Sequence, residues 1–325
     1  MATKILITDG MAKDGVEILK AVPGFEVVVR DSTPKEELEK IIGDYDCIVI
    51  RSATTLTADL IEKAKSMKLI VRAGAGVDNI EVPVATEKKI PVMNTASANS
   101  LAAAEQTIAL LFAMFRQVPQ AAQSLREGRW DRTKFKGFEV TGKHIGVLGL
   151  GNIGRIVADK AIGLGMTVYG YDPQISSKDE LSAILGSKGE SFHLCQTVDE
   201  VLPQVDIVTL HIPKTKETAG LMNAERIAKM KNGSFLMNCA RGGLVEEKAV
   251  LDALEKGKLA GAAFDVFDKE PPEFPNPLFQ NDKVVCAPHL GASTFEAQHR
   301  VALTAAKQIT GFFNKGDRHG VINGL

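Results

Sequence analysis

A turn built on three glycines, Gly149, Gly151 and Gly154, constrains the fold of this chain more than any other feature. The run before it, HIGVLGL, is apolar like a buried strand, and the residues after it have helical spacing. The next run, MTVYGYD, indicates a second strand that ends at Asp172. A G-x-G-x-x-G pattern in this context predicts a turn that binds the pyrophosphate of a dinucleotide. The alternative is a glycine-rich turn that binds nothing.

Each glycine has its own physical role in such a turn. Gly149 allows the tight turn, Gly151 lets the backbone approach the pyrophosphate, and Gly154 lets helix and strand pack closely. The free N–H groups and the positive end of the helix dipole then face the phosphates. Asp172 is placed to accept hydrogen bonds from the adenosine ribose hydroxyls and would repel a 2′-phosphate. Because no arginine or lysine follows it closely, the sequence favours NAD over NADP.

Short β-branched runs alternate with runs of helical spacing along the chain, which predicts parallel sheets covered by helices. Strands are expected in KILITD, FEVVVR, DCIVIR, LIVRAG and IPVMNT, and again in HIGVLGL, MTVYGYD, VDIVTLHIP, GSFLMNCARG, GAAFDVF and KVVCAPHLG. Helices are expected in PKEELEKIIG, where Pro34 suits the first turn, in TADLIEKAKS, and in VEEKAVLDALEKG, where Gly257 is the C′ residue. The sequence therefore predicts two doubly wound α/β units.

A long amphipathic segment lies near the boundary of the two units. Ser100 is expected to be its N-cap, and Pro119 opposes its continuation. One helical face carries Leu101, Ala104, Ile108, Leu111, Phe115 and Val118. This stripe indicates a core helix, or a helix that joins two domains and packs against a second subunit, and the two are compatible. Because the closing helical segment is expected to return to the first domain, the predicted domains are residues 1–98 with 294–325, and residues 99–293.

Composition and charge exclude several classes of protein. The chain has 325 residues, 45% apolar and 24% charged, with a net charge of −1, so we expect no nucleic-acid partner. The start of the chain lacks the pattern of a secretory signal, and the most apolar long segment, LAAAEQTIALLFAMF, is too short to span a bilayer. The four cysteines have no zinc spacing and are expected to be reduced thiols in a cytoplasmic protein without a metal.

Polar residues end several strands of the second set, at the sheet edge where ligands of open α/β folds bind. A hydroxy acid that loses a hydride needs a base for its hydroxyl proton, a carboxylate beside that base, and an arginine for its own carboxylate. His289, Glu270 and Arg241 match these needs. Taken singly, His289 is as readily a structural hydrogen-bonder, Glu270 a solvated loop charge and Arg241 a helix cap. Jointly, beside a dinucleotide fold, they indicate one site.

Two further residues at strand ends are given lesser roles. His211 is expected to be a cofactor-cleft or structural residue. Cys239 is expected to be a small apolar filler near the cofactor and not a nucleophile.

The first unit offers anion-binding groups at corresponding positions. Arg51, followed by Ser52, ends one strand, Arg72 precedes a glycine loop, and Asn99 lies in SANS. Two arginines beside small, backbone-exposing turns favour a phosphorylated acid over a plain one. The alternative is that both arginines are ordinary surface charges.

The motifs GLGNIG, NCARGG, AAFDVFDKEPP and APHLGAST, in this order and spacing, resemble the D-2-hydroxyacid dehydrogenase family. RSAT, RAGAGVDNIEV and NTASANS are similar to the branch of that family that oxidises 3-phospho-D-glycerate. The resemblance implies a Rossmann NAD-binding domain and a flavodoxin-like substrate domain with a cleft between them. It implies oxidation of 3-phospho-D-glycerate to 3-phosphooxypyruvate, the first step of serine biosynthesis. It also implies a homodimer or a dimer-based homotetramer joined through the long helix.

The resemblance carries functional residues over position by position. The catalytic residues would be Arg241, Glu270 and His289. The cofactor site would be lined by Ala75, Asn152, Ile153, Asp172, Ile212, Cys239, Ala240, Arg241, Asp265 and the run from His289 through Gly291 to Ala292. The substrate anions would be held by Arg51, Ser52, Arg72 and Asn99, and Arg132 would reach the partner subunit's site.

Two other functions stay open on the sequence. A glyoxylate or hydroxypyruvate reductase of the same family shares the Arg, Glu and His set and differs at the substrate anion pocket. An NAD-sensing corepressor, a binding protein of another class, keeps the fold and much of the site. Many phosphoglycerate-oxidising relatives continue into C-terminal domains that bind serine. Because this sequence stops at Leu325, we expect a short form without serine feedback.

Overall fold

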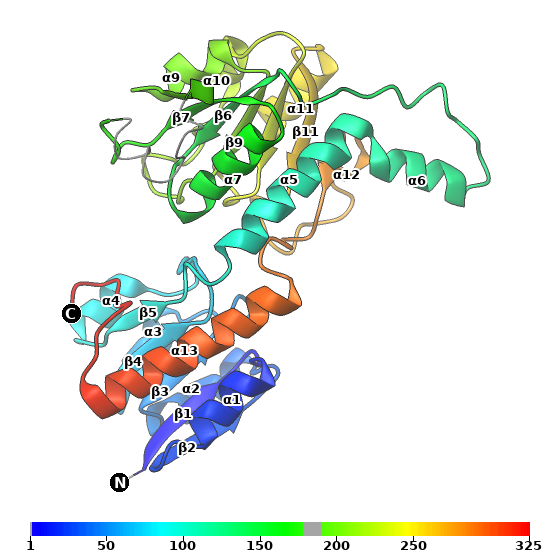
Figure 1. Cartoon of the computed structure of the whole chain (residues 1–325). Helices are drawn as coiled ribbons and strands as arrows, with labels where there is room; N and C mark the ends of the chain where they lie inside the picture. Colours follow the sequence, from blue (N-terminus) through cyan, green and yellow to red (C-terminus); the bar gives the residue numbers. More distant parts are fainter. Residues whose placement is uncertain (1, 178–189) are drawn as a thin grey trace. The chain divides into compact units, whose positions relative to one another are not determined.

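The computed structural model describes residues 2–177 and 190–325, which form two compact units. The first unit comprises Met1–Ser100 together with Ala292–Leu325, and the second comprises Leu101–Gly291. Each unit is an α/β domain built on its own parallel sheet (Figure 1).

The first unit has a five-stranded parallel sheet in the order β2-β1-β3-β4-β5. This order has its switch point between β1 and β3 and is the flavodoxin-like arrangement. The strands are β1 (Thr3–Ile7), β2 (Phe25–Val29), β3 (Cys47–Ile50), β4 (Leu69–Arg72) and β5 (Val92–Asn94). The helices are α1 (Lys13–Lys20), α2 (Lys35–Ile41), α3 (Ala58–Lys63), α4 (Val82–Glu87) and α13 (Phe295–Lys315).

Helices cover both faces of this sheet, because its strands are apolar on both sides. Along β1, Leu6 belongs to one core cluster, whereas Ile5 and Ile7 belong to the cluster on the opposite face. The second of these clusters includes residues of α13, which packs beside α1 (Figure 1). A Cβ atom on Gly15 of α1 would lie only 2.8 Å from the Cβ atom of Ala302, so glycine permits this close helix contact. The closing helix is therefore part of the first unit.

The second unit has a seven-stranded parallel sheet in the order β12-β11-β10-β9-β6-β7-β8. Counted from β6, this is the Rossmann order with one added strand, and its switch point lies between β6 and β9. The strands are β6 (His144–Leu148), β7 (Thr167–Tyr171), β8 (Phe192–Leu194), β9 (Ile207–Leu210), β10 (Ser234–Asn238), β11 (Leu259–Phe264) and β12 (Val284–Cys286). The helices are α5 (Ser100–Arg116), α6 (Val118–Arg126), α7 (Asn152–Gly163), α9 (Val198–Val201), α10 (Ala224–Lys229), α11 (Glu247–Glu255) and α12 (Pro277–Gln280).

The long amphipathic segment is two helices and not one. α5 ends at Arg116, Gln117 adopts a left-handed conformation with φ of 51°, and α6 begins at Val118. The stripe is buried at Ala104, Leu111 and Phe115, but its outermost members, Leu101 and Val118, are exposed. The expected N-cap is wrong, because Ser100 lies inside the helix and its hydroxyl donates to the Ala96 carbonyl oxygen.

Most of the other local predictions are confirmed, and two details differ. All eleven predicted strands form, and Gly257, with φ of 69°, follows the C-cap of α11 as expected. Pro34 is the N-cap of α2 instead of its first helical residue. The short strand β8 at the sheet edge was not predicted. The four cysteines form no disulfide.

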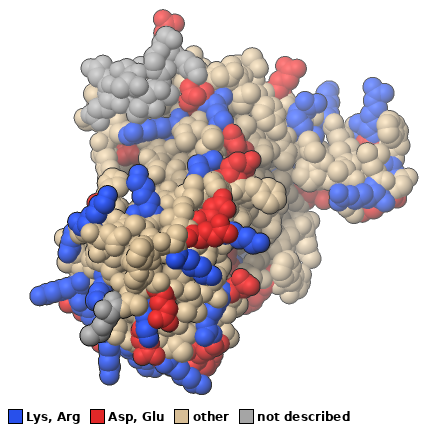
Figure 2. Space-filling model, turned by 60° about the horizontal axis from the view of Figure 1, so that its bottom comes forward, with Lys and Arg blue, Asp and Glu red and all other residues tan. Residues whose placement is uncertain are grey.

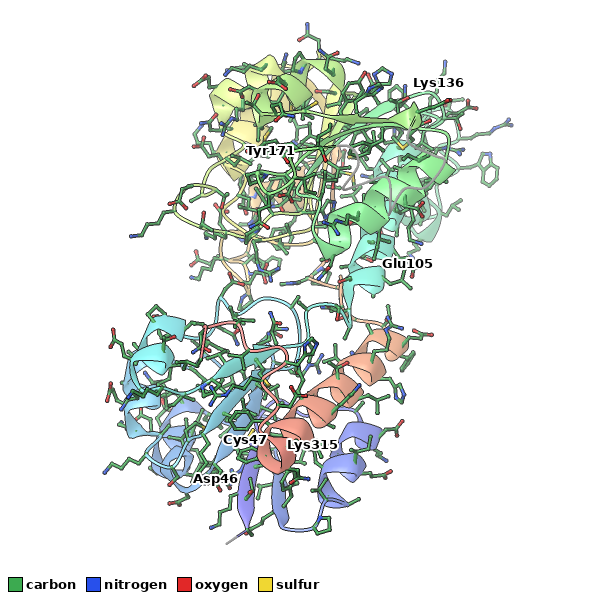
Figure 3. The ribbon with its side chains drawn as sticks, turned by 60° about the vertical axis from the view of Figure 1, so that its left-hand side comes forward. Asp46, Cys47, Glu105, Lys136, Tyr171 and Lys315 are labelled. Atoms are coloured by element: carbon green, nitrogen blue, oxygen red, sulfur yellow. The ribbon has the colours of Figure 1, made fainter. Side chains whose placement is uncertain are left out.

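One ion pair on the surface of the second unit joins two of its helices. Glu105 on α5 pairs with Lys160 on α7 at 3.3 Å, and Figure 3 shows Glu105 on α5 and Tyr171 at the end of β7. Figure 2 shows basic and acidic side chains interspersed over one face of the molecule.

Within the described ranges, no helix combines the length and apolar character needed to cross a bilayer. The same residues contain no group of His, Cys, Asp or Glu side chains able to hold a metal ion.

Candidate active site

The glycine turn follows β6 and leads directly into α7. Gly149 has φ of 94°, a conformation that glycine adopts readily. A Cβ atom on Gly154 would lie 1.9 Å from the Gly149 carbonyl oxygen, so the turn and the helix touch at this point. Two of the three glycines are thus required by the protein itself.

Gly151 is different, because the protein does not need it to be glycine. Its φ of −69° suits any residue, and a Cβ atom there would meet nothing within 4 Å. Gly151 is the N-cap of α7 without a side-chain cap, so the first N–H groups of this twelve-residue helix are open to a ligand. The missing side chain leaves room for a group outside the protein, and this fits a dinucleotide pyrophosphate.

Asp172 follows β7 and is fixed by two main-chain groups. Leu150 N–H donates to its Oδ2 at 2.8 Å, and Gln174 N–H donates to its Oδ1 at 2.9 Å. The Leu150 bond ties Asp172 to the glycine turn, so the carboxylate and the turn keep one relative position. Both carboxylate oxygens retain a lone pair that can accept a ribose hydroxyl.

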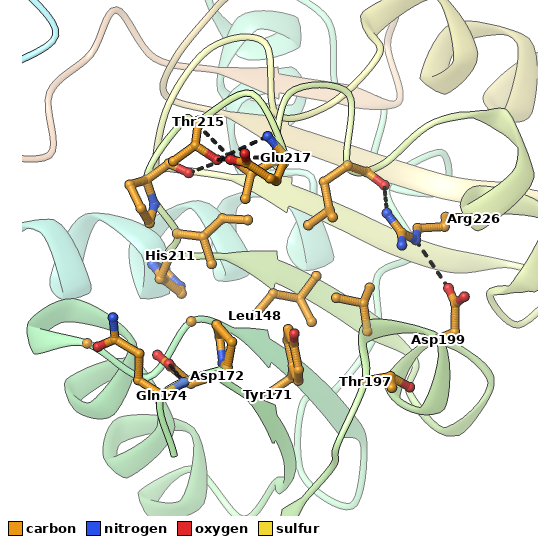
Figure 4. A pocket seen from close by; sticks show the side chains of 18 residues that line it. Leu148, Tyr171, Asp172, Gln174, Thr197, Asp199, His211, Thr215, Glu217 and Arg226 are labelled. Atoms are coloured by element: carbon orange, nitrogen blue, oxygen red, sulfur yellow. Dashed lines mark hydrogen bonds and ion pairs between the residues drawn. The ribbon is translucent and has the colours of Figure 1, made fainter. Parts of the chain in front are cut away.

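A cavity of about 850 Å³ opens beside the glycine turn, within the size range of small-molecule and cofactor sites. Five predicted residues line it, namely Gly149, Gly151, Asp172, His211 and Ile212. Residues that the sequence did not single out complete its outer end, among them Thr197, Asp199, Thr215, Glu217, Thr218 and Arg226. Figure 4 shows Asp172 and Gln174 on one wall, Thr215 and Glu217 on another, and the ion pair of Arg226 with Asp199 at 3.2 Å.

His211 follows β9 and is a neutral residue under the glycine turn. Burial lowers its pKa to about 3. Its Nε2 lies 3.0 Å from the Thr209 hydroxyl oxygen, and its Nδ1 has no hydrogen-bond partner within the described ranges. The His211 carbonyl oxygen lies against Gly149, where a Cβ atom would approach it to 2.5 Å. His211 therefore shapes the turn while it lines the cavity.

The turn after β10 places Arg241. Asn238, the last residue of β10, accepts a hydrogen bond from Ala240 N–H through Oδ1 and donates through Nδ2 to the Arg241 carbonyl oxygen at 2.9 Å. The Arg241 guanidinium also donates to the Ala240 carbonyl oxygen at 2.6 Å. Sequence reasoning missed Asn238, although its position at a strand end in NCARGG was a usable signal.

His289 and Glu270 form a hydrogen-bonded pair, with His289 Nδ1 2.6 Å from Glu270 Oε2. The other carboxylate oxygen of Glu270 accepts a hydrogen bond from Phe267 N–H at 3.0 Å. Burial alone would raise the pKa of Glu270, but these hydrogen bonds and the charges of His289 and Arg241 outweigh it and hold the pKa below its ordinary value. Because Glu270 is charged, His289 Nδ1 carries the proton and Nε2 is left to accept one.

Asp265 holds the backbone that presents His289. His289 itself is left-handed, with φ of 54°, which costs a residue other than glycine about 1–2 kcal/mol. The buried Asp265 carboxylate accepts hydrogen bonds from Leu290 N–H at 2.8 Å and from Gly291 N–H at 2.7 Å. Burial is the largest influence on Asp265 and raises its pKa above the ordinary value, although these N–H groups lower it. The strained backbone is thus fixed by a dedicated side chain.

A second cavity, of about 660 Å³, opens beside the pair and is lined by Glu270, His289 and mostly apolar residues such as Phe267, Phe274 and Cys286. Cys239 lies after β10, and burial raises its pKa to about 12, so its thiol is neutral. A neutral buried thiol suits the filler role predicted for it.

The first unit brings its own predicted residues to the carboxyl ends of β3 and β4. Arg51 N–H donates to Asp9 Oδ2 at 2.7 Å, and Asn79 Nδ2 donates to the carbonyl oxygens of Arg51 and Thr54. These bonds fix the loop that carries Arg51 and the exposed Ser52. The Arg72 side chain crosses the following glycine loop, where a Cβ atom on Gly74 would lie 1.3 Å from Arg72 Nη1.

The remaining predicted residues divide between the two units. Ala75, whose carbonyl oxygen accepts from Asn94, and the buried Asn99 lie in the first unit, as does Ala292. Asn152 and Ile153 begin α7 in the second unit. Arg132 is exposed in the segment between α6 and β6. The structure brings together Arg241, Asp265, Glu270 and His289 within one unit.

Comparisons with known proteins show the family to which this chain belongs. Residues 108–291 match the model of the "D-isomer specific 2-hydroxyacid dehydrogenase, NAD binding domain". The chain is 46% identical over 306 residues to D-3-phosphoglycerate dehydrogenase of Methanocaldococcus jannaschii, covering 94% of this chain and 56% of the relative. It is 43% identical over 320 residues to D-3-phosphoglycerate dehydrogenase of Sus scrofa, covering 98% of this chain and 58% of the relative. The chain thus spans a little over half the length of these curated relatives.

A solved structure gives the same picture for the fold. The crystal structure of a glyoxylate reductase from Paecilomyes thermophila is similar with a TM-score of 0.87 and 29% identity, covering 99% of this chain and 98% of that chain. The region that matches the family model contains the Rossmann strand order and the glycine turn with its cavity, which are the features of an NAD-binding domain. The chain belongs to the D-isomer specific 2-hydroxyacid dehydrogenase family and carries its NAD-binding domain.

Proposed function

We propose that this protein oxidises 3-phospho-D-glycerate to 3-phosphooxypyruvate with NAD. The observation that carries the proposal is the hydrogen-bonded pair of His289 and Glu270, held in the same unit as Arg241 and the dinucleotide cavity. The curated relatives described above bear the name of this activity, at 43–46% identity. Two arginines at strand ends of the first unit support a substrate with a phosphate as well as a carboxylate.

The chain's own residues divide the work of the reaction. Bound NAD supplies the hydride acceptor. His289 Nε2 takes the proton of the substrate hydroxyl, and the Glu270 carboxylate stabilises the imidazolium that results. Arg241 binds the substrate carboxylate and, in the reverse direction, polarises the carbonyl oxygen. The balance is one hydride removed from carbon and one proton removed from oxygen.

The substrate anions are assigned to the first unit. We assign Arg51, Ser52, Arg72 and Asn99 to substrate binding, with residues 1–98 and 294–325 as the substrate domain and residues 99–293 as the NAD domain. Asp9 and Asn79 support this assignment, because they fix the loop of Arg51 before any ligand arrives. A preformed loop loses less entropy when it binds an anion.

The oligomeric state is part of the same proposal. The segment that includes α6 exposes large apolar side chains, with Trp130 80% and Leu125 58% exposed. Exposed apolar groups that gather in one segment favour a protein interface. We propose a homodimer, or a tetramer built from it, joined through α5 and α6, with Arg132 near the partner subunit's site and the protein located in the cytoplasm.

The deciding experiment is a substrate panel with the purified protein. The expected result is a rise in absorbance at 340 nm from the reduced cofactor. With 3-phospho-D-glycerate this rise should be much faster with NAD than with NADP, and much faster than with D-glycerate. Preferred reduction of glyoxylate or hydroxypyruvate would instead favour the second candidate, which the similarity to a glyoxylate reductase structure supports. Binding of NADH without turnover of any hydroxy acid would indicate an NAD-sensing protein.

A further inference from the structure

The segment of Phe267 and Asp268 contacts the Arg241 turn and the Glu270–His289 pair at once. Gly243 N–H, two residues after Arg241, donates to Asp268 Oδ1 at 2.8 Å. A Cβ atom on Gly242 would lie 1.7 Å from the Phe267 carbonyl oxygen, so the two backbones touch. On its other side, Phe267 N–H donates to Glu270 Oε1 at 3.0 Å. One two-residue segment therefore joins the arginine to the acid–base pair.

Glu247 anchors this segment to a helix. Asp268 N–H donates to Glu247 Oε1 at 2.9 Å, and Glu247 is the first residue of α11. A carboxylate in the first turn of a helix is favoured by the helix dipole, so Glu247 is a firm attachment point. Burial and the like charge of Asp268 raise the pKa of Glu247, whereas the hydrogen bond from Asp268 N–H lowers it.

Because Asp268 lies on the surface, a contribution to folding stability does not account for its hydrogen bond to the Arg241 turn. Asp268 is exposed, and its carboxylate is not part of a hydrophobic cluster. Exposed aspartates usually contribute little to folding. The main-chain group that donates to Asp268 Oδ1 is Gly243 N–H, two residues after Arg241, and Glu270 follows two residues after Asp268.

We propose that Asp268, held by Glu247, is a positioning residue that fixes the Arg241 turn relative to the Glu270–His289 pair. This inference rests on the proposed function, because it assigns Arg241 to the substrate carboxylate and His289 to the proton. Arginine and base act on two atoms of one small substrate, and a misplacement of about 1 Å between catalytic groups costs up to about 100-fold in rate. Asp268 supplies the contact that prevents such a shift.

Single substitutions test the hydrogen bond. Asp268→Ala is expected to lower kcat/KM about 10- to 100-fold while the Kd for NADH and the urea midpoint change little. Asp268→Asn is expected to restore most of the rate, because its amide oxygen can accept the same bond from Gly243. Lys269→Ala is the matched control in the same loop, since the Lys269 ammonium group pairs with Glu273. Equal rates in Asp268→Ala and the control would overturn the proposal.

A double-mutant cycle separates positioning from a general effect. If Asp268 acts through Arg241, the double variant Arg241→Ala/Asp268→Ala is as slow as Arg241→Ala alone. Losses that multiply in the double variant would show that Asp268 acts elsewhere, and would overturn the inference. If Asp268→Ala does not fold, Asp268→Ser replaces it in the cycle.

The wild-type chain is assayed first on the whole substrate panel. Failure of the proposed function can then be told apart from failure of the positioning role of Asp268. A wild-type chain that favours glyoxylate over phosphoglycerate refutes the proposed substrate, and the cycle is then run with glyoxylate. If the wild type is active and Asp268→Ala has the same kcat/KM as the wild type, the positioning role alone is refuted. A wild type without turnover on any member overturns both.

Discussion

His289 Nδ1 and Glu270 Oε2 lie 2.6 Å apart although nineteen positions separate the two residues in the sequence. The contact exists because the turn after β12 and the loop after β11 both leave the carboxyl edge of the same parallel sheet. It assigns the proton to Nδ1 and leaves Nε2 as the acceptor, which is the tautomer that a base for a hydroxyl proton requires.

Replacement of His289 tests the base directly. His289→Ala is expected to lower the rate of oxidation by about 10² to 10⁴, while the Kd for NADH stays near that of the wild type. His299→Ala is the control, because His299 belongs to the first unit, where its Nδ1 pairs with Asp14 at 3.0 Å. A His289→Ala variant with full rate would mean that the proton goes to another group.

Replacement of Glu270 tests the charge beside the base. Glu270→Gln removes the negative charge that favours the imidazolium, so the acid limb of the rate profile should move to lower pH. In the folded state the pKa of Glu270 lies below its ordinary value. The Glu270 charge therefore stabilises the fold at pH values above the ordinary pKa, and this stabilisation is lost as the pH falls through the folded pKa. Urea unfolding should therefore show the variant less stable than the wild type at pH 7, with a difference that shrinks as the pH falls below the ordinary pKa of a glutamate. A constant difference across this range would contradict the charge argument.

The glycine turn offers a paired test of the dinucleotide site. Gly151→Ala adds a Cβ atom where the protein has open space, so stability should be kept while affinity for NADH falls. Gly154→Ala puts a Cβ atom 1.9 Å from the Gly149 carbonyl oxygen, so it should lower the melting temperature. Thermal unfolding and NADH titration of both variants measure the contrast. Unchanged NADH affinity in Gly151→Ala would place the pyrophosphate elsewhere.

Replacement of the two arginines of the first unit tests whether they bind the substrate phosphate. Arg51→Ala and Arg72→Ala should raise KM for 3-phospho-D-glycerate far more than for D-glycerate, because only the former carries the second anion. Arg30→Ala, whose guanidinium pairs with Glu37 on the same unit, is the control. Equal losses on both substrates would show that these arginines bind the shared carboxylate or act on the fold.

Burial of His211 predicts a pH dependence of stability. The folded pKa of about 3 lies below the ordinary value near 6.5, so the unfolded chain binds the extra proton and stability falls as pH drops from 6.5 towards 3. Between pH 7 and pH 5 this linkage amounts to about 2 kcal/mol. His211→Gln should flatten the curve by that amount in urea unfolding at the two pH values. Parallel curves would indicate that His211 is hydrated.

The sequence predicted the features that repeat along the backbone. Alternating apolar runs gave the two parallel sheets, and strand ends led to Asp172, Arg241, Glu270 and His289. It did not predict β8, because FHL at positions 192–194 is too short to show a period. For the long segment, Pro119 signalled that the helix would not continue, but the left-handed Gln117 that separates α5 from α6 was not predicted, since the spacing of the apolar stripe runs on to Val118.

Contacts between a side chain and a distant main-chain group escaped prediction altogether. The contacts of Asp9 under the Arg51 loop and of Glu247 below Asp268 depend on where two distant parts of the chain meet after folding. No spacing along the chain encodes such meetings. The groups proposed to react were thus visible in the sequence, whereas most of the groups that hold them in place were not.

The return of α13 to the first unit sets an order for folding during synthesis on the ribosome. Its residues Val301, Ala305, Ala306 and Ile309 complete the core cluster that also contains Ile5, Ile7 and Leu19. The second unit is continuous in sequence, so it can fold as soon as residue 291 has left the exit tunnel. Most of the first unit is made first, but one face of its sheet stays only partly covered, by α1, until the last helix has been made.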